Sequence, residues 1–151
     1  MSNRRTLREL VLKALYAHWQ GGGDAAHIIK TVITDELSDT DEKSEAQFAE
    51  RLFVKTIKNR DDFDVLIEPN LKNWDLNRIA LVDKLVLHMA ISEFLYFDDI
   101  PTKVTINEAI EIAKKYSTAN SGRFVNGLLD VIRDQLRDQN RLNKTGRGLV
   151  D

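Results

Sequence analysis

The chain has 151 residues, 42% of them hydrophobic and 30% charged, with a formal net charge of −2. This balance is typical of a globular protein and excludes an intrinsically disordered one. The absence of cysteine excludes disulfides, cysteine-based zinc sites and thiol chemistry. No apolar run is long enough to span a membrane, and the basic N-terminus lacks the apolar core of a signal peptide, so we expect a cytoplasmic protein.

Charge is unevenly distributed along the sequence. Residues 1–23 contain four bases and one acid, whereas residues 24–75 contain thirteen acids and seven bases. The four bases are Arg4, Arg5, Arg8 and Lys13. Because local fields rather than net charge steer phosphate-bearing partners, the basic start of the chain is a candidate contact for a polyanion.

Apolar residues recur at helical spacing almost everywhere, and this pattern predicts an all-α fold. A first helix is expected at about residues 3–20, ended by Gly21-Gly22-Gly23. The second and third helices are expected at about residues 25–37 and 44–57, and the apolar period of the third continues to residue 71. Near Asp61-Asp62 the third helix should bend, and we expect these carboxylates and Asp64 in solvated turns.

Trp74-Asp75 marks the expected boundary between the two halves of a single domain. A long apolar helix, capped by Asp75 or Asn77 and running to about residue 95, should be central and buried because it is apolar nearly all round. The predicted organisation is an N-terminal half at about 3–73, a C-terminal half at about 75–140, and a flexible basic tail at 141–151.

Two further helices complete the C-terminal half. Thr105-Ile106-Asn107-Glu108 has the pattern of a capping box and predicts a helix that runs to about Tyr116. The last helix is expected to start at about Ser121, after a loop.

We find no catalytic or metal-binding constellation in the sequence. His18, His27 and His88 lie on separate predicted elements without ligand spacing, and a histidine on an apolar face is more often a hydrogen-bonded core residue than a ligand. Gly21-Gly22-Gly23 lacks the Gly-Lys-Ser/Thr ending of a P-loop. We therefore expect no enzyme activity, no metal and no cofactor.

Arginines at the start of the first helix are the most informative feature. The positive end of the helix dipole disfavours each cation there by roughly 0.3–1 kcal/mol, yet Arg4, Arg5 and Arg8 stand in this turn. Their flank, which suits phosphates and unstacked bases, also carries Leu12, Tyr16 and Trp19. The same pattern fits a solubilising basic face beside core aromatics.

A second candidate anion site lies at residues 120–124. Asn120 or Ser121 can cap a helix there, and Arg123 adds positive charge to the exposed N–H groups of the helix start. Taken alone, such a segment is more often just a capped helix.

Four segments of the sequence occur together, in this order, in one known family. They are residues 4–10 with 14–16, residues 74–75 with 78–84, residues 100–114, and residues 120–130. Through them the chain resembles the NusB family of bacterial transcription antitermination factors over about residues 4–132. This resemblance implies two three-helix halves, six or seven helices in all, and no catalysis.

The resemblance also implies binding of single-stranded boxA RNA in a heterodimer with NusE, a protein of the small ribosomal subunit. The pair would join an antitermination complex on RNA polymerase during ribosomal RNA synthesis. Tyr16 and Asp83 fall at positions expected to face NusE. Carried over by motif position, the RNA surface consists of Arg4, Arg5, Arg8, Asn120, Ser121, Gly122, Arg123 and Phe124.

Three positions depart from the family pattern. Asn120 stands where Asp is frequent, and because a neutral amide repels phosphate less, we expect RNA binding at least as strong as after an Asn120→Asp substitution. His88 stands where arginine is common and Ser92 where tyrosine is common. Both lie on the expected central helix and bear on packing or partner contacts rather than on the fold.

Two other functions stay open at this point. One is a helical protein-interaction adaptor whose basic helix only solubilises it. The other is the RNA-recognition domain of a ribosomal RNA methyltransferase, although the sequence contains no Gly-rich cofactor loop and no catalytic cysteine. The preferred RNA sequence also stays open, as does whether the free protein is a monomer or a homodimer.

Overall fold

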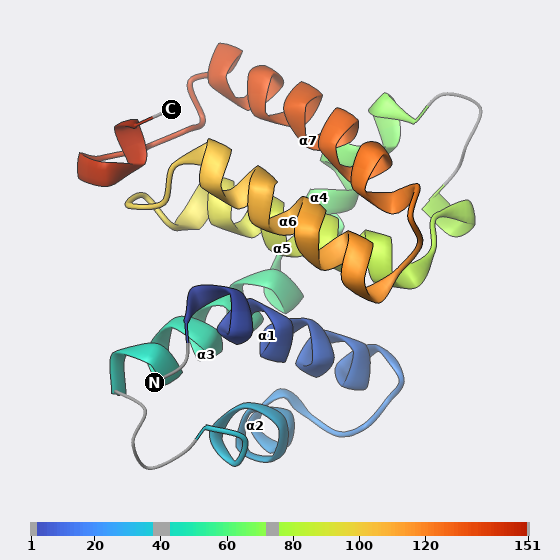
Figure 1. The fold of residues 1–151 in the computed structure, drawn as a ribbon, viewed down its shortest axis with the longest axis vertical. Helices are drawn as coiled ribbons and strands as arrows, with labels where there is room; N and C mark the ends of the chain where they lie inside the picture. The colour runs from blue at the N-terminus through green and yellow to red at the C-terminus, as the bar shows by residue number, and fades with distance from the viewer. Residues whose placement is uncertain (1–2, 38–42, 72–75, 151) are drawn as a thin grey trace. The chain divides into compact units, whose positions relative to one another are not determined.

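The computed structural model describes residues 3–37, 43–71 and 76–150. Within these ranges the chain forms seven α-helices, short 3₁₀ and π segments, and no β-strand, which confirms the predicted all-α fold (Figure 1). The chain divides into two compact units, Met1–Lys58 and Asn59–Asp151.

The first unit is built on α1, which packs against α3 and η1. Its helix start is capped by Asn3, whose Oδ1 accepts a hydrogen bond from the Thr6 N–H at 2.8 Å. After α1 the chain turns through Gly21, whose φ of 79° is a conformation that favours glycine. The elements are α1 (Arg4–Trp19), α2 (Ala25–Ile28), the π-helical η1 (Ile29–Thr34) and α3 (Lys43–Lys58).

The second unit is built around α5, which contacts α4, α6 and α7 (Figure 1). Every residue from Leu85 to Phe94 is buried, as predicted for a helix that is apolar nearly all round. The elements are α4 (Arg60–Ile67), η2 (Glu68–Asn70), η3 (Leu76–Arg78), α5 (Leu81–Tyr96), α6 (Thr102–Tyr116), α7 (Ser121–Asp138) and η4 (Gly146–Leu149).

The start of α5 differs from the prediction. The helix begins at Leu81, after a 3₁₀ turn that contains Asn77, so Asn77 does not cap it. The other predicted cap, Asp75, lies outside the described residues together with Trp74, and so does the boundary predicted there.

The predicted capping box of α6 is wrong. The helix begins three residues earlier, at Thr102, directly after Pro101, which has the extended conformation of an N-cap residue. Thr105 is inside the helix, and its hydroxyl donates to Glu93 Oε1 at 2.9 Å in the core. Because the Thr105 hydroxyl is hydrogen-bonded to the Glu93 carboxylate, it does not cap the start of α6.

The bend predicted near residues 61–62 lies two residues earlier. α3 ends at Lys58 and α4 starts at Arg60, which places Asp61 and Asp62 in the first turn of α4, where the helix dipole favours acids. α4 groups with the second unit, whereas the sequence pattern placed it in the N-terminal half.

The segment after α7, expected to be a flexible tail, is folded over its described residues. Lys144 Nζ donates to the carbonyl oxygens of Glu93 at 3.0 Å and Phe97 at 2.8 Å. A lysine fits the C-terminal end of a helix because it can bond the last carbonyls and complement the negative dipole end. The 3₁₀ turn η4 follows this contact.

Candidate nucleic-acid interface

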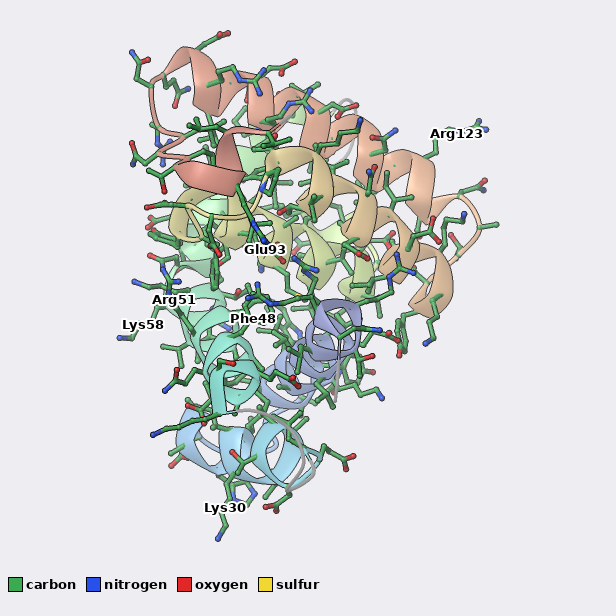
Figure 2. All side chains as sticks on the ribbon, turned by 60° about the vertical axis from the view of Figure 1, so that its left-hand side comes forward. Lys30, Phe48, Arg51, Lys58, Glu93 and Arg123 are labelled. Carbon is green, nitrogen blue, oxygen red and sulfur yellow. The ribbon has the colours of Figure 1, made fainter. Side chains whose placement is uncertain are left out.

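The first turn of α1 presents cations at the surface of the first unit. Arg4 and Arg5 are exposed, and the turn contains no acid. The guanidinium carbon of Arg4 lies 3.9 Å from the centre of the Phe48 ring. Phe48, which comes from α3, is labelled in Figure 2. This cation–π contact holds a positive group in a defined place on the surface.

Arg8, predicted on the same flank, is only 4% exposed. Its guanidinium carbon lies 5.7 Å from the centre of the same Phe48 ring. Leu12, one turn further along α1, is also buried. Of the three arginines, only Arg4 and Arg5 therefore present exposed side chains.

Two aromatic side chains are exposed toward the other end of α1. Tyr16 is 45% exposed and Trp19 is 42% exposed. They lie three residues apart and so share one face of the helix. Grouped exposed apolar side chains are typical of surfaces that bind another macromolecule, and Tyr16 is one of the two residues expected to face a protein partner.

The segment 120–124 opens α7 but is not capped as predicted. Asn120 occupies the N-cap position, and its side chain makes no capping hydrogen bond. Gly122 packs against α6, because a Cβ there would lie 2.8 Å from the Lys114 side chain. Arg123 is exposed and extends away from α7 (Figure 2), and Phe124 is half-buried.

Ser121 and Asp83 are buried against each other. Ser121 is 3% exposed, and its hydroxyl donates to Asp83 Oδ2 at 3.0 Å. The same hydroxyl is also hydrogen-bonded to Ser117 and Thr118, just before α7. Asp83, in the first turn of α5, is 7% exposed. Both residues therefore join the starts of α5 and α7 and offer little surface to a ligand.

Phe124 lines two cavities of the second unit. One measures about 310 Å³ and also has Arg78, Ile79 and Asp83 in its wall. The other measures about 420 Å³ and lies between η2 and α7. Sequence reasoning missed both cavities, and Arg78 with them, because each is formed by segments far apart in the chain.

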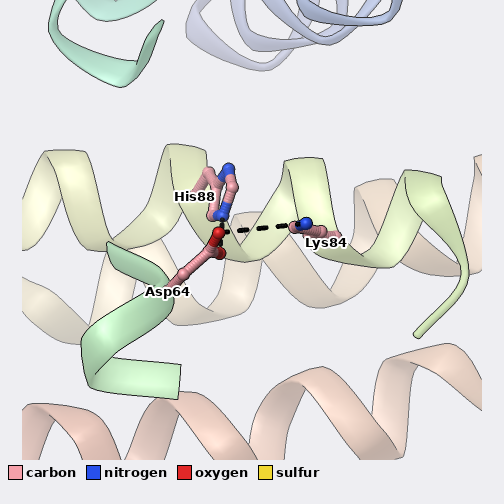
Figure 3. A network of polar contacts seen from close by, with 3 residues as sticks. All are labelled: Asp64, Lys84 and His88. Atoms are coloured by element: carbon pink, nitrogen blue, oxygen red, sulfur yellow. Dashed lines mark hydrogen bonds and ion pairs between the residues drawn. The ribbon is translucent and has the colours of Figure 1, made fainter. Parts of the chain in front are cut away.

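A polar cluster joins α4 to α5 (Figure 3). Asp64 Oδ1 lies 2.7 Å from His88 Nε2, and Asp64 Oδ2 lies 3.9 Å from Lys84 Nζ. Burial raises the pKa of Asp64, but the hydrogen bond and charge of His88, with the charges of Lys84 and Arg60, outweigh it and lower the pKa below its ordinary value. His88 is confirmed as a hydrogen-bonded core residue, and the solvated turn expected for Asp64 is wrong.

In residues 3–37, 43–71 and 76–150, no three His, Cys, Asp or Glu side chains are grouped so as to hold a metal ion. No helix within the same ranges has the length and apolar character needed to cross a membrane.

In comparisons with known proteins, the matching family model and the similar proteins belong to the same family. Residues 5–134 match the model of the NusB family. A transcription antitermination protein NusB from Salinibacter ruber is 48% identical over 150 residues, which cover 99% of this chain and 92% of that protein.

Solved structures of this family share the fold. A NusB structure from T. maritima has 40% sequence identity and a TM-score of 0.78, and the match covers 89% of this chain and 92% of that one. A structure of antitermination factors NusB and NusE in complex with dsRNA has a TM-score of 0.77 at 21% identity, covering 87% of this chain and 96% of that one. At that identity, the likeness shows the fold alone.

Proposed function

Because the chain belongs to the NusB family of transcription antitermination proteins, we propose that it binds boxA-type single-stranded RNA together with NusE. The pair would act within an antitermination complex on RNA polymerase and promote processive ribosomal RNA transcription. A solved structure that holds NusB, NusE and dsRNA supports this proposal by the shared fold.

The observation that carries the proposal is the pair of exposed arginines in the first turn of α1. A helix start attracts anions through its free N–H groups and its positive dipole end, and Arg4 and Arg5 strengthen this attraction. Arg4 is already held 3.9 Å above Phe48, so less side-chain freedom is lost when it binds a phosphate. Such contacts position a nucleic-acid strand without reading its sequence.

The start of α7, in the second unit, is a second proposed RNA-binding surface. Arg123 is an exposed cation, and the half-buried Phe124 follows it in the sequence. An aromatic ring next to a cation suits a single strand, whose unstacked bases lie on the ring while the phosphates meet the charge. Sequence preference would come from this part, because base contacts rather than phosphate contacts discriminate.

We propose that NusE contacts the exposed face of α1 at Tyr16, and that Trp19 extends this contact. Asp83 is too buried to contribute much area. Its role in this proposal is to position α7 through the hydrogen bond from Ser121.

Fluorescence anisotropy with a labelled boxA RNA and a scrambled RNA of the same composition tests the proposal. We expect a preference for boxA that NusE strengthens and that falls with salt, because each phosphate neutralised releases counterions. Equal binding of the two RNAs, with and without NusE, would contradict the proposal. It would favour a protein adaptor that binds through Tyr16 and Trp19.

A further inference from the structure

We propose that residues 140–150 form a C-terminal clasp, which closes the end of α5 and restrains the connection from α5 to α6. The segment follows α7 at the red end of the chain in Figure 1. It lies beyond residues 5–134, which match the family model, whereas α5 and α6 lie inside that range. The clasp is a conformational device and does not depend on the proposed RNA binding.

Asn140 reverses the chain at the end of α7. Its φ of 56° is left-handed, a conformation that asparagine adopts more readily than most other residues with a side chain. The Asn140 N–H donates to the Arg137 carbonyl oxygen at 3.0 Å, and the Arg141 N–H donates to the Leu136 carbonyl oxygen at 2.9 Å. This pair of bonds is a Schellman motif, which ends the helix and lets the chain reach α5 four residues later, at Lys144.

α5 ends without a cation of its own. Its last turn, residues 93–96, contains no basic residue and includes Glu93, although the negative end of the helix dipole favours bases and disfavours acids. By contrast, α3, α6 and α7 each carry a base in their last turn. Lys144 supplies the missing charge, because its Nζ donates to the carbonyl oxygens of Glu93 at 3.0 Å and Phe97 at 2.8 Å.

Backbone contacts hold the clasp against Asp98, in the connection from α5 to α6. The Thr145 N–H donates to the Asp98 carbonyl oxygen at 3.0 Å. Gly148 is buried, and a Cβ at this position would overlap the same carbonyl oxygen. Only glycine allows such a close approach of two backbones. Three positions of the clasp, Lys144, Thr145 and Gly148, therefore contact residues 93–98.

The residues under the clasp also position α6. The Ile100 N–H donates to the Phe97 carbonyl oxygen at 3.1 Å, and α6 begins two residues after Ile100. The Glu93 carboxylate accepts a hydrogen bond from the Thr105 hydroxyl of α6 at 2.9 Å. Since Glu93 and Phe97 take part in both sets of contacts, release of the clasp should loosen the end of α5 and the start of α6 by local opening.

NMR on full-length variants tests the clasp. Lys144→Met removes the ammonium group and keeps an unbranched apolar side chain. We expect the order parameters of the Thr145 and Gly148 amides to fall from about 0.85 to below about 0.6, while the middle of α7 stays rigid. The Phe97 and Ile100 amides should exchange with solvent roughly tenfold faster or more, the size expected for the loss of one hydrogen bond to a charged group.

Arg147→Met is the matched control, because Arg147 is an exposed base of the same segment. Its order parameters and exchange rates should equal those of the wild-type chain. Unchanged order of Thr145 in Lys144→Met would overturn the inference. Loss of order in the clasp without faster exchange at Phe97 and Ile100 would also overturn it, since the segment would then be docked without restraining α5.

Gly148→Ala releases the clasp by a second route, because it retains Lys144 and blocks the close approach to Asp98. Each single variant should lower Tm by a few degrees. The Lys144→Met/Gly148→Ala variant should unfold close to the Tm of the less stable single variant, since either change already releases the segment. Fully additive losses of Tm would indicate independent local contacts and contradict a single clasp.

Discussion

Ser121 joins the starts of two helices through one buried hydroxyl. It donates to Asp83 Oδ2 at 3.0 Å, while Asp83 Oδ1 has no hydrogen-bond partner in the described part of the chain. Removing this donor would leave the buried Asp83 carboxylate without its hydrogen bond, and an unsatisfied buried polar group lowers the stability of the fold by roughly 1–3 kcal/mol. The position of Arg123 and Phe124, two and three residues further on, depends on the same hydrogen bond.

We expect Ser121→Ala to lower the free energy of unfolding by about 1–3 kcal/mol and to weaken boxA RNA binding as well. Urea unfolding and anisotropy on the same protein measure the two effects. In an Asp83→Ala background the Ser121→Ala change should have much less effect on stability, because the acceptor is already gone. Equal stability losses in both backgrounds would show that the hydrogen bond is not the cause.

Arg4 and Arg8 show that the burial of a single side chain could not be predicted from the sequence. They lie one turn apart on α1 and approach the same Phe48 ring, at 3.9 Å and 5.7 Å, yet only Arg4 is exposed. Helical periodicity predicts which flank a side chain occupies. It does not predict how deeply a neighbouring helix covers that flank, because Phe48 comes from α3, far along the chain.

At the scale of elements, α4 is joined to α5 by the charged cluster of Asp64, His88 and Lys84. Since folding lowers the pKa of Asp64, the folded state stabilises its ionised form. The stabilisation of the fold by the ionised Asp64 is fully present above the pKa of this carboxyl in the unfolded chain, about 3.9. It is lost as the pH falls through the lower pKa of the folded state.

Asp64→Asn should therefore reduce the free energy of unfolding by about 1–3 kcal/mol near neutral pH, since it leaves the buried His88 with a weaker partner. The difference from the wild-type chain should shrink below about pH 4, where the wild-type carboxyl also becomes neutral. Urea unfolding over a series of pH values measures this difference.

Asp62→Asn is the matched control, because Asp62 is exposed on the same helix and its replacement should remove only the contribution of the helix dipole, roughly 0.3–1 kcal/mol. A stability difference between wild type and Asp64→Asn that stays constant from neutral pH to about pH 2, below the ordinary carboxyl pKa, would rule out the ionised carboxylate as its source.

Helices could be predicted from the sequence more securely than their ends. The apolar periodicity of α5 is local information, and its burial follows from it. The start of α6 could not be predicted, since the Thr105 hydroxyl bonds Glu93, twelve residues away. The folding of the last segment also escaped prediction, because Lys144 donates to carbonyls of Glu93 and Phe97 near the end of α5.

At the scale of the whole molecule, net charge is a poor guide to the partner. The chain carries −2 overall, yet both proposed RNA surfaces present exposed arginines, Arg4 and Arg5 in the first unit and Arg123 in the second. Charge pattern alone leaves a polyanion-binding face and a solubilising face as alternatives. The resemblance to the NusB family favours the first, and the family match over residues 5–134 confirms that resemblance.

The most direct test compares two double variants that remove the same charge from the first unit. Arg4→Ala/Arg5→Ala removes the proposed phosphate-binding side chains, whereas Lys30→Ala/Lys58→Ala removes two exposed lysines elsewhere (Figure 2). The Kd for boxA RNA is measured for both and for wild type over a range of salt concentrations. We expect the arginine variant to bind more weakly, with Tm unchanged and a salt slope smaller by about 0.7 for each phosphate that is no longer neutralised, and the lysine variant to match wild type. Wild-type affinity and salt slope in the arginine variant would contradict RNA binding through α1.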